Sequence, residues 1–176
     1  EEGGGPEVVW IRQIASSDYA LFVWPSSLVL AQHLWDRRGE LAGLRVLELG
    51  AGVGLPGIVA ARAGAIVTLT DRNDPKVLEN LGVNAKRNNV ADRCQVAALD
   101  WGEFSEATKA LREMQFDLVV GADCLYAASD IDPFLASVSC FLSAGPRTNP
   151  LPHSSPPATT PGAATPGAAT PGGGGV

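Results

Sequence analysis

Short apolar runs alternate with amphipathic stretches over most of the chain. Runs of this length, rich in Val, Leu and Ile, are typical of buried strands. They occur at 45–49 (RVLEL), 66–70 (IVTLT), 95–99 (QVAAL) and 116–122 (FDLVVGA). A further segment, 20–24 (ALFVW), is expected to be extended.

The amphipathic stretches between these runs predict helices. One opens at Pro25 and presents an apolar face, and a short one covers 57–64 with Pro56 at its first turn. Two others are expected at 75–87 and 131–142. The apolar positions of the first helix are Leu28, Leu30, Ala31, Leu34 and Trp35, and those of the helix at 75–87 are Val77, Leu78, Leu81 and Val83.

Strands that are apolar on both faces and separated by helices indicate a parallel sheet covered on its two sides. With right-handed crossovers, such a chain forms a doubly wound, Rossmann-like α/β fold. Ligands of this fold bind at the carboxyl ends of the strands. We therefore searched the residues that follow each predicted strand for polar and glycine motifs.

Composition narrows the function classes. The chain has 176 residues, 45% of them hydrophobic, which suits one domain with a core. A net charge of −6 disfavours direct binding to nucleic acid. No apolar run predicts a membrane span, so a cytoplasmic or nuclear location is expected. Cys94, Cys124 and Cys140 lack metal-ligand spacing, so no metal site is expected.

Three segments are predicted. Residues 18–143 carry the strand and helix pattern, and 1–17 form an N-terminal extension. Residues 144–176 are rich in Pro, Gly, Ala and Thr and are expected to be disordered, either as a natural tail or as the product of out-of-frame translation. Because the chain begins with Glu1 and its one methionine is Met114, we expect a fragment of a longer protein.

A glycine loop follows the first predicted strand in VLELGAGVGLPG (46–57). The loop matches the pattern of dinucleotide sites from Gly52 onward, but that match alone is weak. Glu48 precedes Gly50 by two residues, and a carboxylate there would repel a pyrophosphate. The same carboxylate suits the ammonium and sulfonium groups of S-adenosylmethionine (SAM), which glycines allow to approach the backbone closely.

Acidic residues also follow the next two predicted strands. Asp71 comes directly after the second strand, where a carboxylate can accept hydrogen bonds from both ribose hydroxyls. Asp74, before Pro75, is the better candidate for the helix cap. Asp100 and Trp101 follow the third strand, and together they offer an adenine ring a stacking surface and a hydrogen-bond partner.

The fourth strand is followed by Ala122, Asp123, Cys124, Leu125 and Tyr126. Asp123 can hold an incoming amine, and the Tyr126 hydroxyl can orient its lone pair for methyl transfer. Cys124 is expected to be a packing residue. These residues lie next to the glycine-loop strand if the sheet has the doubly wound order.

With these motifs in place, the chain resembles methyltransferase family 16 and the related methyltransferase-like proteins, over about 18–143. The agreement lies in FVWPSSLVLAQHLW, VLELGAGVGLPG, TDRND, VLENLGVNAKRNN, LDWG and DCLY, the last matching the DxxY motif of the family. The resemblance implies catalytic roles for Asp123 and Tyr126. It implies SAM as cofactor, contacted by Trp24, Glu48, Gly50, Ala51, Gly52, Asp71, Asp100, Trp101 and Ala122.

The resemblance also implies a seven-strand sheet of order 3-2-1-4-5-7-6, of which this chain provides the first four strands. GPRT (145–148) stands where a fifth strand is due, so an exposed apolar edge is expected at 116–122. The implied acceptor is a lysine in a protein such as a chaperone, a translation factor or a histone. The open alternatives are arginine methylation, small-molecule methylation, an inactive cofactor-binding module and, last, an NAD-dependent oxidoreductase.

Overall fold

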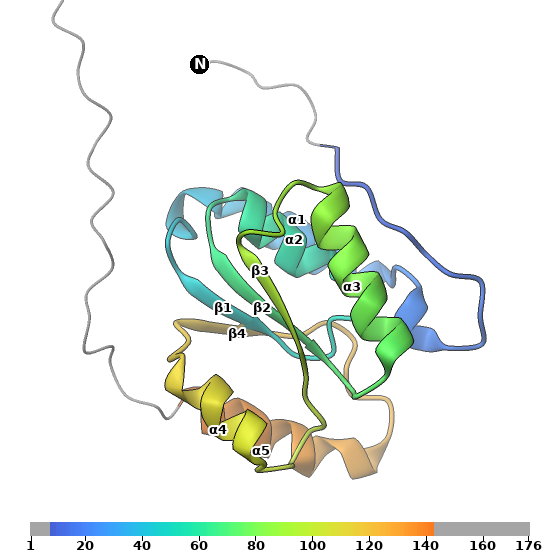
Figure 1. The fold of residues 1–176 in the computed structure, drawn as a ribbon, viewed down its shortest axis with the longest axis vertical. Coiled ribbons are helices and arrows are strands. Elements are labelled where there is room, and N and C mark those ends of the chain that lie inside the picture. The colour runs from blue at the N-terminus through green and yellow to red at the C-terminus, as the bar shows by residue number, and fades with distance from the viewer. Residues whose placement is uncertain (1–7, 143–176) are drawn as a thin grey trace, which may run out of the picture.

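The computed structural model describes residues 8–142, which form a four-stranded sheet with helices on both faces (Figure 1). The order of the strands is β3-β2-β1-β4, and all neighbours are parallel. Their bounds are Arg45–Glu48 for β1, Ile66–Asp71 for β2, Cys94–Ala98 for β3 and Leu118–Val120 for β4. The predicted fold class is confirmed, including the central position of the glycine-loop strand.

Helices α1 (Pro25–Asp36), α2 (Leu55–Arg62) and α3 (Pro75–Arg87) cover one face of the sheet. Helices α4 (Glu106–Glu113) and α5 (Ile131–Leu142) cover the other (Figure 1). Three short 3-10 helices complete the described part: η1 (Tyr19–Leu21), η2 (Arg38–Glu40) and η3 (Ala128–Asp130).

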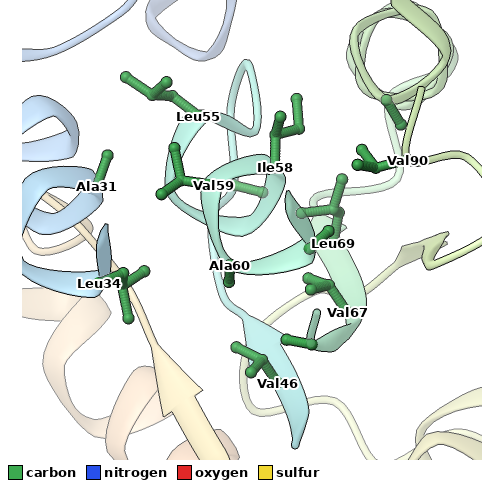
Figure 2. Packing of buried hydrophobic residues seen from close by; sticks show 14 of the residues in the cluster. Ala31, Leu34, Val46, Leu55, Ile58, Val59, Ala60, Val67, Leu69 and Val90 are labelled. Atoms are coloured by element: carbon green, nitrogen blue, oxygen red, sulfur yellow. The ribbon is translucent and has the colours of Figure 1, made fainter. Parts of the chain in front are cut away.

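Alternation along β1 divides the buried residues into two clusters. Val46 packs with α1 and α2 residues such as Leu34 and Ile58 (Figure 2), whereas Leu47 packs toward α4 and α5 with Phe141. Side chains of a strand point alternately to opposite faces, so one short strand contributes to both clusters. The sheet is therefore covered on both sides, as its apolar strands predict.

Two local predictions need correction. Residues 20–24 are not uniformly extended, because Ala20 and Leu21 belong to η1, whose N-terminus is capped by the Asp18 carboxylate. The sequence analysis also missed α4, which is mainly polar and buries Thr108 and Leu111. Its one clear local signal is Ser105, the N-cap, whose hydroxyl accepts from the Thr108 N–H.

The structure differs from the prediction more in where helices and strands begin and end than in which segments are helices or strands. The strand predicted at 116–122 is limited to Leu118–Val120, and β3 begins one residue earlier than predicted, at Cys94. Leu28 of α1 lies in the predicted apolar face but is 56% exposed. Within residues 8–142, β4 pairs with β1 alone, so its other edge has no strand partner there. The predicted tail, 144–176, and GPRT lie outside the described residues.

An asparagine ladder on α3 binds the N-terminal segment. Asn88 pairs with the backbone N–H and C=O of Trp10, and Asn84 does the same with Arg12. Asn80 donates a further bond to the Arg12 carbonyl. These three side chains lie four residues apart, Asn80 and Asn84 on one face of α3 and Asn88 at its C-cap, and all are buried. They anchor the start of the segment that leads to η1 and α1.

Within residues 8–142 no helix has the length and apolar character needed to cross a bilayer. The same part of the chain contains no cluster of three or more His, Cys, Asp or Glu side chains suited to a metal ion. All three cysteines are free thiols.

Candidate functional site

A cavity of about 530 Å³ opens at the carboxyl ends of the strands. This volume is in the range of small-molecule sites. All eleven residues that the sequence analysis selected line it, so the fold brings together motifs that lie far apart in the sequence, from Trp24 to Tyr126. They are Trp24, Glu48, Gly50, Ala51, Gly52, Asp71, Asp100, Trp101, Ala122, Asp123 and Tyr126.

The glycine loop depends on residues without a side chain. Gly50 and Gly52 have φ values of +61° and +57°, which L side chains rarely adopt. A Cβ at Gly50 would lie 3.1 Å from Trp101, and one at Gly52 would lie 3.2 Å from the Ala20 carbonyl oxygen. The loop thus lies in close contact with Trp101, which follows β3, and with η1.

Glu48 lies at the end of β1 and is 2% exposed. Its Oε2 accepts a hydrogen bond from the Gly57 N–H at 2.9 Å, in the first turn of α2. Burial raises the pKa of Glu48 to about 8, against the lowering effect of that bond. Glu48 therefore positions α2 as well as lining the cavity, a structural function that the motif did not reveal. Its predicted contact with a cationic ligand stays a prediction.

Asp71 is 7% exposed at the end of β2. Its carboxylate accepts from the Gly52 N–H at 2.8 Å and from the Arg72 N–H at 2.9 Å. Burial raises the pKa of Asp71 more than these bonds lower it. Asp71 therefore fixes the glycine loop from the neighbouring strand. The predicted cap role of Asp74 is confirmed, because its carboxylate accepts from the Lys76 N–H at 2.9 Å.

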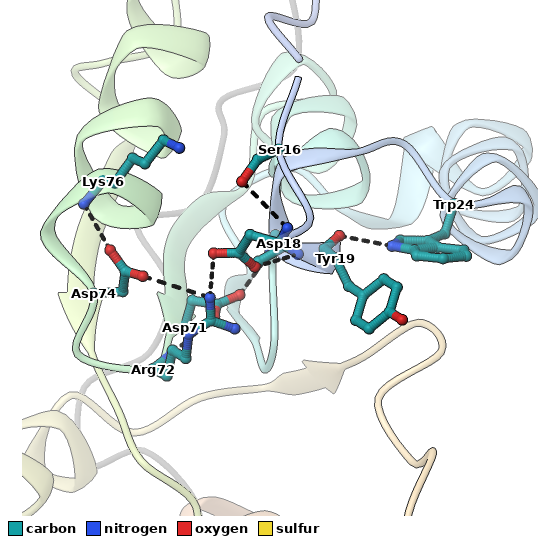
Figure 3. A network of polar contacts seen from close by, with 10 residues as sticks. Ser16, Asp18, Tyr19, Trp24, Asp71, Arg72, Asp74 and Lys76 are labelled. Carbon is teal, nitrogen blue, oxygen red and sulfur yellow. Dashed lines mark hydrogen bonds and ion pairs between the residues drawn. The ribbon is translucent and has the colours of Figure 1, made fainter. Parts of the chain in front are cut away.

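Arg72 connects the cavity to the N-terminal segment (Figure 3). Its guanidinium forms an ion pair with Asp18 and a longer one, at 3.5 Å, with Asp74. The hydrogen bond from Arg72 lowers the pKa of Asp18. Arg72 lines the cavity but forms its ion pairs with residues outside it, and its charge also acts to lower the pKa of Asp71.

The two residues predicted to contact adenine differ in their surroundings, because Trp101 is packed and Asp100 is exposed. Trp101 meets Phe134 edge-on, with ring centroids 5.1 Å apart, and also reaches Gly50. Asp100 is exposed, and its carboxylate accepts a long hydrogen bond, 3.4 Å, from the Asn73 N–H. Trp101 therefore has a packing partner in the core and a surface on the cavity, as a stacking residue requires.

Asp123 and Tyr126 lie just beyond β4, which pairs with β1 as predicted. Asp123 is exposed and has φ +56°, an uncommon backbone region that Asp tolerates. Tyr126 is 73% exposed. Partial desolvation, followed by the charges of Asp71 and Asp130, raises the pKa of Tyr126, so the hydroxyl keeps its proton at neutral pH.

Cys124, between them, points inward. Its thiol donates to the Leu49 carbonyl oxygen at 3.2 Å, and burial raises its pKa to about 12. A thiol in this state is a poor nucleophile, in agreement with the packing role predicted for it.

Acidic side chains outnumber basic ones in the cavity wall, although the buried Glu48, with a pKa of about 8, holds a proton at neutral pH. Five acidic residues line it against one basic residue, Arg72, whose guanidinium is paired elsewhere. The five are Glu48, Asp71, Asp100, Asp123 and Asp130. Such a wall attracts cations and repels phosphate groups.

The sequence analysis missed part of the wall. Tyr19, Ala20 and Phe22 reach the cavity from the N-terminal segment, and Asp130 reaches it from η3. One signal for the N-terminal segment was available in the four-residue spacing of Asn80, Asn84 and Asn88. Buried amides at such intervals need hydrogen-bond partners, which a neighbouring backbone segment can supply. No local pattern marks the partner segment itself.

Solved structures share this architecture at low identity, which supports the fold alone. Protein arginine methyltransferase 10 of Arabidopsis thaliana matches with a TM-score of 0.53 at 19% identity, over 72% of this chain and 34% of that one. Magnesium protoporphyrin IX methyltransferase of Synechocystis, with bound SAM, matches with a TM-score of 0.53 at 20% identity, over 65% and 53% of the two chains.

Curated relatives share more sequence. The histone-arginine methyltransferase METTL23 of Rattus norvegicus is 38% identical over 82% of this chain and 64% of its own length. The protein N-lysine methyltransferase METTL21A of Danio rerio is 40% identical over 72% of this chain and 56% of its own. The chain spans about three fifths of these relatives. The family model described as lysine methyltransferase matches residues 5–147, and the chain belongs to that family.

Proposed function

We propose that this chain is the cofactor-binding part of a SAM-dependent protein N-methyltransferase that acts on a cationic side chain. The observation that carries the proposal is the acidic wall of the cavity, in which four aspartate carboxylates and the protonated Glu48 face one guanidinium that is already paired. A pyrophosphate beside these carboxylates would be repelled, whereas SAM and a basic acceptor both bring positive charge. An NAD-dependent reaction is therefore disfavoured.

The residues present fit SAM. Gly50 and Gly52 keep the loop free of side chains, and Glu48 and Ala51 line the same end of the cavity. We assign the cationic methionine end to this loop. Asp71 would hold the ribose, and Asp100 with Trp101 would hold the adenine. Trp24 and Ala122 complete the wall.

When bound, SAM would supply a methyl group: the acceptor nitrogen would lose a proton to solvent, and its lone pair would then bond to the methyl carbon as the carbon–sulfur bond breaks and the neutral thioether leaves. We assign Asp123 to holding the acceptor nitrogen and Tyr126 to orienting its lone pair. Tyr126 acts as a neutral hydroxyl, since its raised pKa keeps it protonated. Both side chains are exposed at the cavity, where a substrate side chain can enter. Their contribution is mainly positioning.

Lysine is the first proposed acceptor, since the family model carries that description and the METTL21A relatives are named for it. Arginine is the second proposed acceptor. It stays open because METTL23 proteins, which are named for histone-arginine methylation, match a larger share of the chain than METTL21A of Danio rerio does. We propose a protein substrate in the cytoplasm or nucleus, such as a chaperone, a translation factor or a histone.

A thermal-shift experiment tests the cofactor assignment. S-adenosylhomocysteine (SAH) should raise the melting temperature of the protein, and NAD should not. Asp71→Ala should remove the SAH effect, because the ribose partner is lost and the Gly52 N–H loses its acceptor. Asp92→Ala, an exposed acid outside the cavity, is the matched control and should keep the effect. Stabilisation by NAD and not by SAH would reject the proposal.

A further inference from the structure

The Tyr19 side chain is 67% exposed at the cavity, although the backbone that carries it is firmly held. The Asp18 carboxylate caps η1 by accepting from the Ala20 N–H at 3.0 Å. The Trp24 indole N–H donates to the Tyr19 carbonyl oxygen at 2.8 Å. Arg72 ties Asp18 to the end of β2 (Figure 3). The fold therefore fixes the backbone from which the Tyr19 ring projects.

The Tyr19 ring gains little from burial in the free protein. It meets Trp24 at a tilt of 56°, with centroids 5.8 Å apart, and points away from the Asp18–Arg72 pair (Figure 3). An exposed aromatic side chain on a firmly held backbone is typical of a recognition surface. Its place on the cavity wall makes the ligand of this cavity the natural partner.

The residues that share this cavity with Tyr19 define the partner's chemistry. Tyr126 is also largely exposed, and Asp123 and Asp130 add two carboxylates. In the part of the chain that the structure describes, neither carboxylate forms a salt bridge. Asp130 accepts one bond, from the Ser129 hydroxyl at 3.2 Å. Aromatic faces and unpaired carboxylates both attract cations.

We propose that Tyr19 and Asp130 are specificity residues that, with Asp123 and Tyr126, receive the cationic side chain of the acceptor. Tyr19 offers a cation–π face and Asp130 a compensating charge. This inference rests on the proposed methyltransferase function and adds residues from two segments outside its motifs. The recognised chemistry is a positively charged nitrogen on a flexible stem, which lysine and arginine share.

The test uses the full chain saturated with SAH and short Gly/Ser peptides that carry a single lysine or arginine. Acetyl-lysine and citrulline peptides are the neutral counterparts of similar size. Dissociation constants measured by NMR titration report binding without any methyl transfer. The charged peptides should bind measurably tighter than the neutral ones, and the lysine and arginine series show which acceptor is preferred.

Variants then locate the recognition. Tyr19→Ala should weaken the charged peptides about threefold, whereas Tyr19→Phe, which keeps the ring, should not. Asp130→Asn should weaken them about fivefold, and the matched control Asp132→Asn, outside the cavity, should not. The affinity for SAH should stay constant throughout, because these residues are assigned to the acceptor.

The outcomes separate the two proposals. Unchanged peptide affinity in Tyr19→Ala and Asp130→Asn, or equal binding of the neutral peptides, overturns this inference and leaves the proposed function intact. Failure of the parent chain to bind SAH overturns both. A loss of SAH affinity in Tyr19→Ala alone also rejects the assignment, because Tyr19 would then belong to the cofactor side.

Discussion

The two sides of the cavity use their acidic residues in opposite ways. Glu48 and Asp71 are almost fully buried, and each binds backbone N–H groups of the glycine loop or α2. Asp123 is exposed, and Tyr126 on the same loop is 73% exposed. The first pair belongs to the folded framework, whereas the second contributes little to it.

Because of this difference, substitutions of the same residue type should have different effects on folding at the two sides. A buried carboxylate that holds backbone donors affects folding and ligand binding together. An exposed one at the cavity mouth can be changed with little effect on folding. The cofactor side and the acceptor side should therefore separate in experiments that measure stability and function on the same variants.

The largest expected effect is a loss of methyl transfer with little change in the free energy of unfolding. Asp123→Asn should lower methyl transfer about 100-fold or more, because the amide carries no charge to hold the acceptor. Asn tolerates the positive φ of this position, so the free energy of unfolding should change by less than about 0.5 kcal/mol. Transfer from labelled SAM to cell-extract proteins and denaturant unfolding measure the two quantities.

Asp132→Asn, a neighbouring acid outside the cavity, is the control for this change. Equal activity of parent and Asp123→Asn would remove Asp123 from the acceptor side. A parent that binds SAH and transfers no methyl group would instead support an inactive cofactor-binding module.

A second prediction concerns pH and the buried side. The pKa of Glu48 is about 8 when folded, above its ordinary value of 4.5, so the native state holds a proton that the unfolded state releases. The free energy of unfolding should therefore fall as pH rises from about 4.5 to 8. The slope for one such group is at most about 1.4 kcal/mol per pH unit.

Glu48→Gln should flatten this slope. The amide oxygen can still accept from the Gly57 N–H but cannot ionise. The stability difference between variant and parent should grow with pH over that window, as measured by denaturant unfolding between pH 5 and 9. Glu113→Gln, an exposed change, is the control. A difference that is constant with pH would show that Glu48 does not titrate there.

The smallest expected effect concerns Asn84, which binds the N-terminal segment. Asn84→Ala removes hydrogen bonds to the Arg12 backbone and to the Val53 carbonyl oxygen. Unfolding free energy should fall by about 2 kcal/mol, because buried backbone groups lose their partners. SAH affinity should fall as well, since the N-terminal segment carries part of the cavity wall.

Lys86→Ala, an exposed change on the same helix, should leave stability and SAH affinity unchanged. Chemical denaturation and calorimetric titration with SAH measure the two quantities. An Asn84→Ala protein with parental stability would show that the ladder does not hold the N-terminal segment in solution.

The parallel sheet, the helix that opens at Pro25 and the helices at 75–87 and 131–142 were predictable, because each element carries its own periodic apolar pattern. The strand order came from the family resemblance. Helix α4 was not, since its amphipathic pattern rests on few apolar residues. The strand ends also pointed to the cavity, because parallel strands bring their carboxyl ends to one edge.

The sequence by itself determined the doubly wound sheet through local periodicity, and it determined eleven residues at the carboxyl edge through glycine and acid motifs together with the family resemblance. Only the tertiary structure decided that Glu48 and Asp71 hold backbone N–H groups, and that Tyr19 and Asp130 join the cavity. The physical reason is distance along the chain. Asn84 and Arg12 are 72 residues apart, and a contact of that range leaves no periodic trace in either segment.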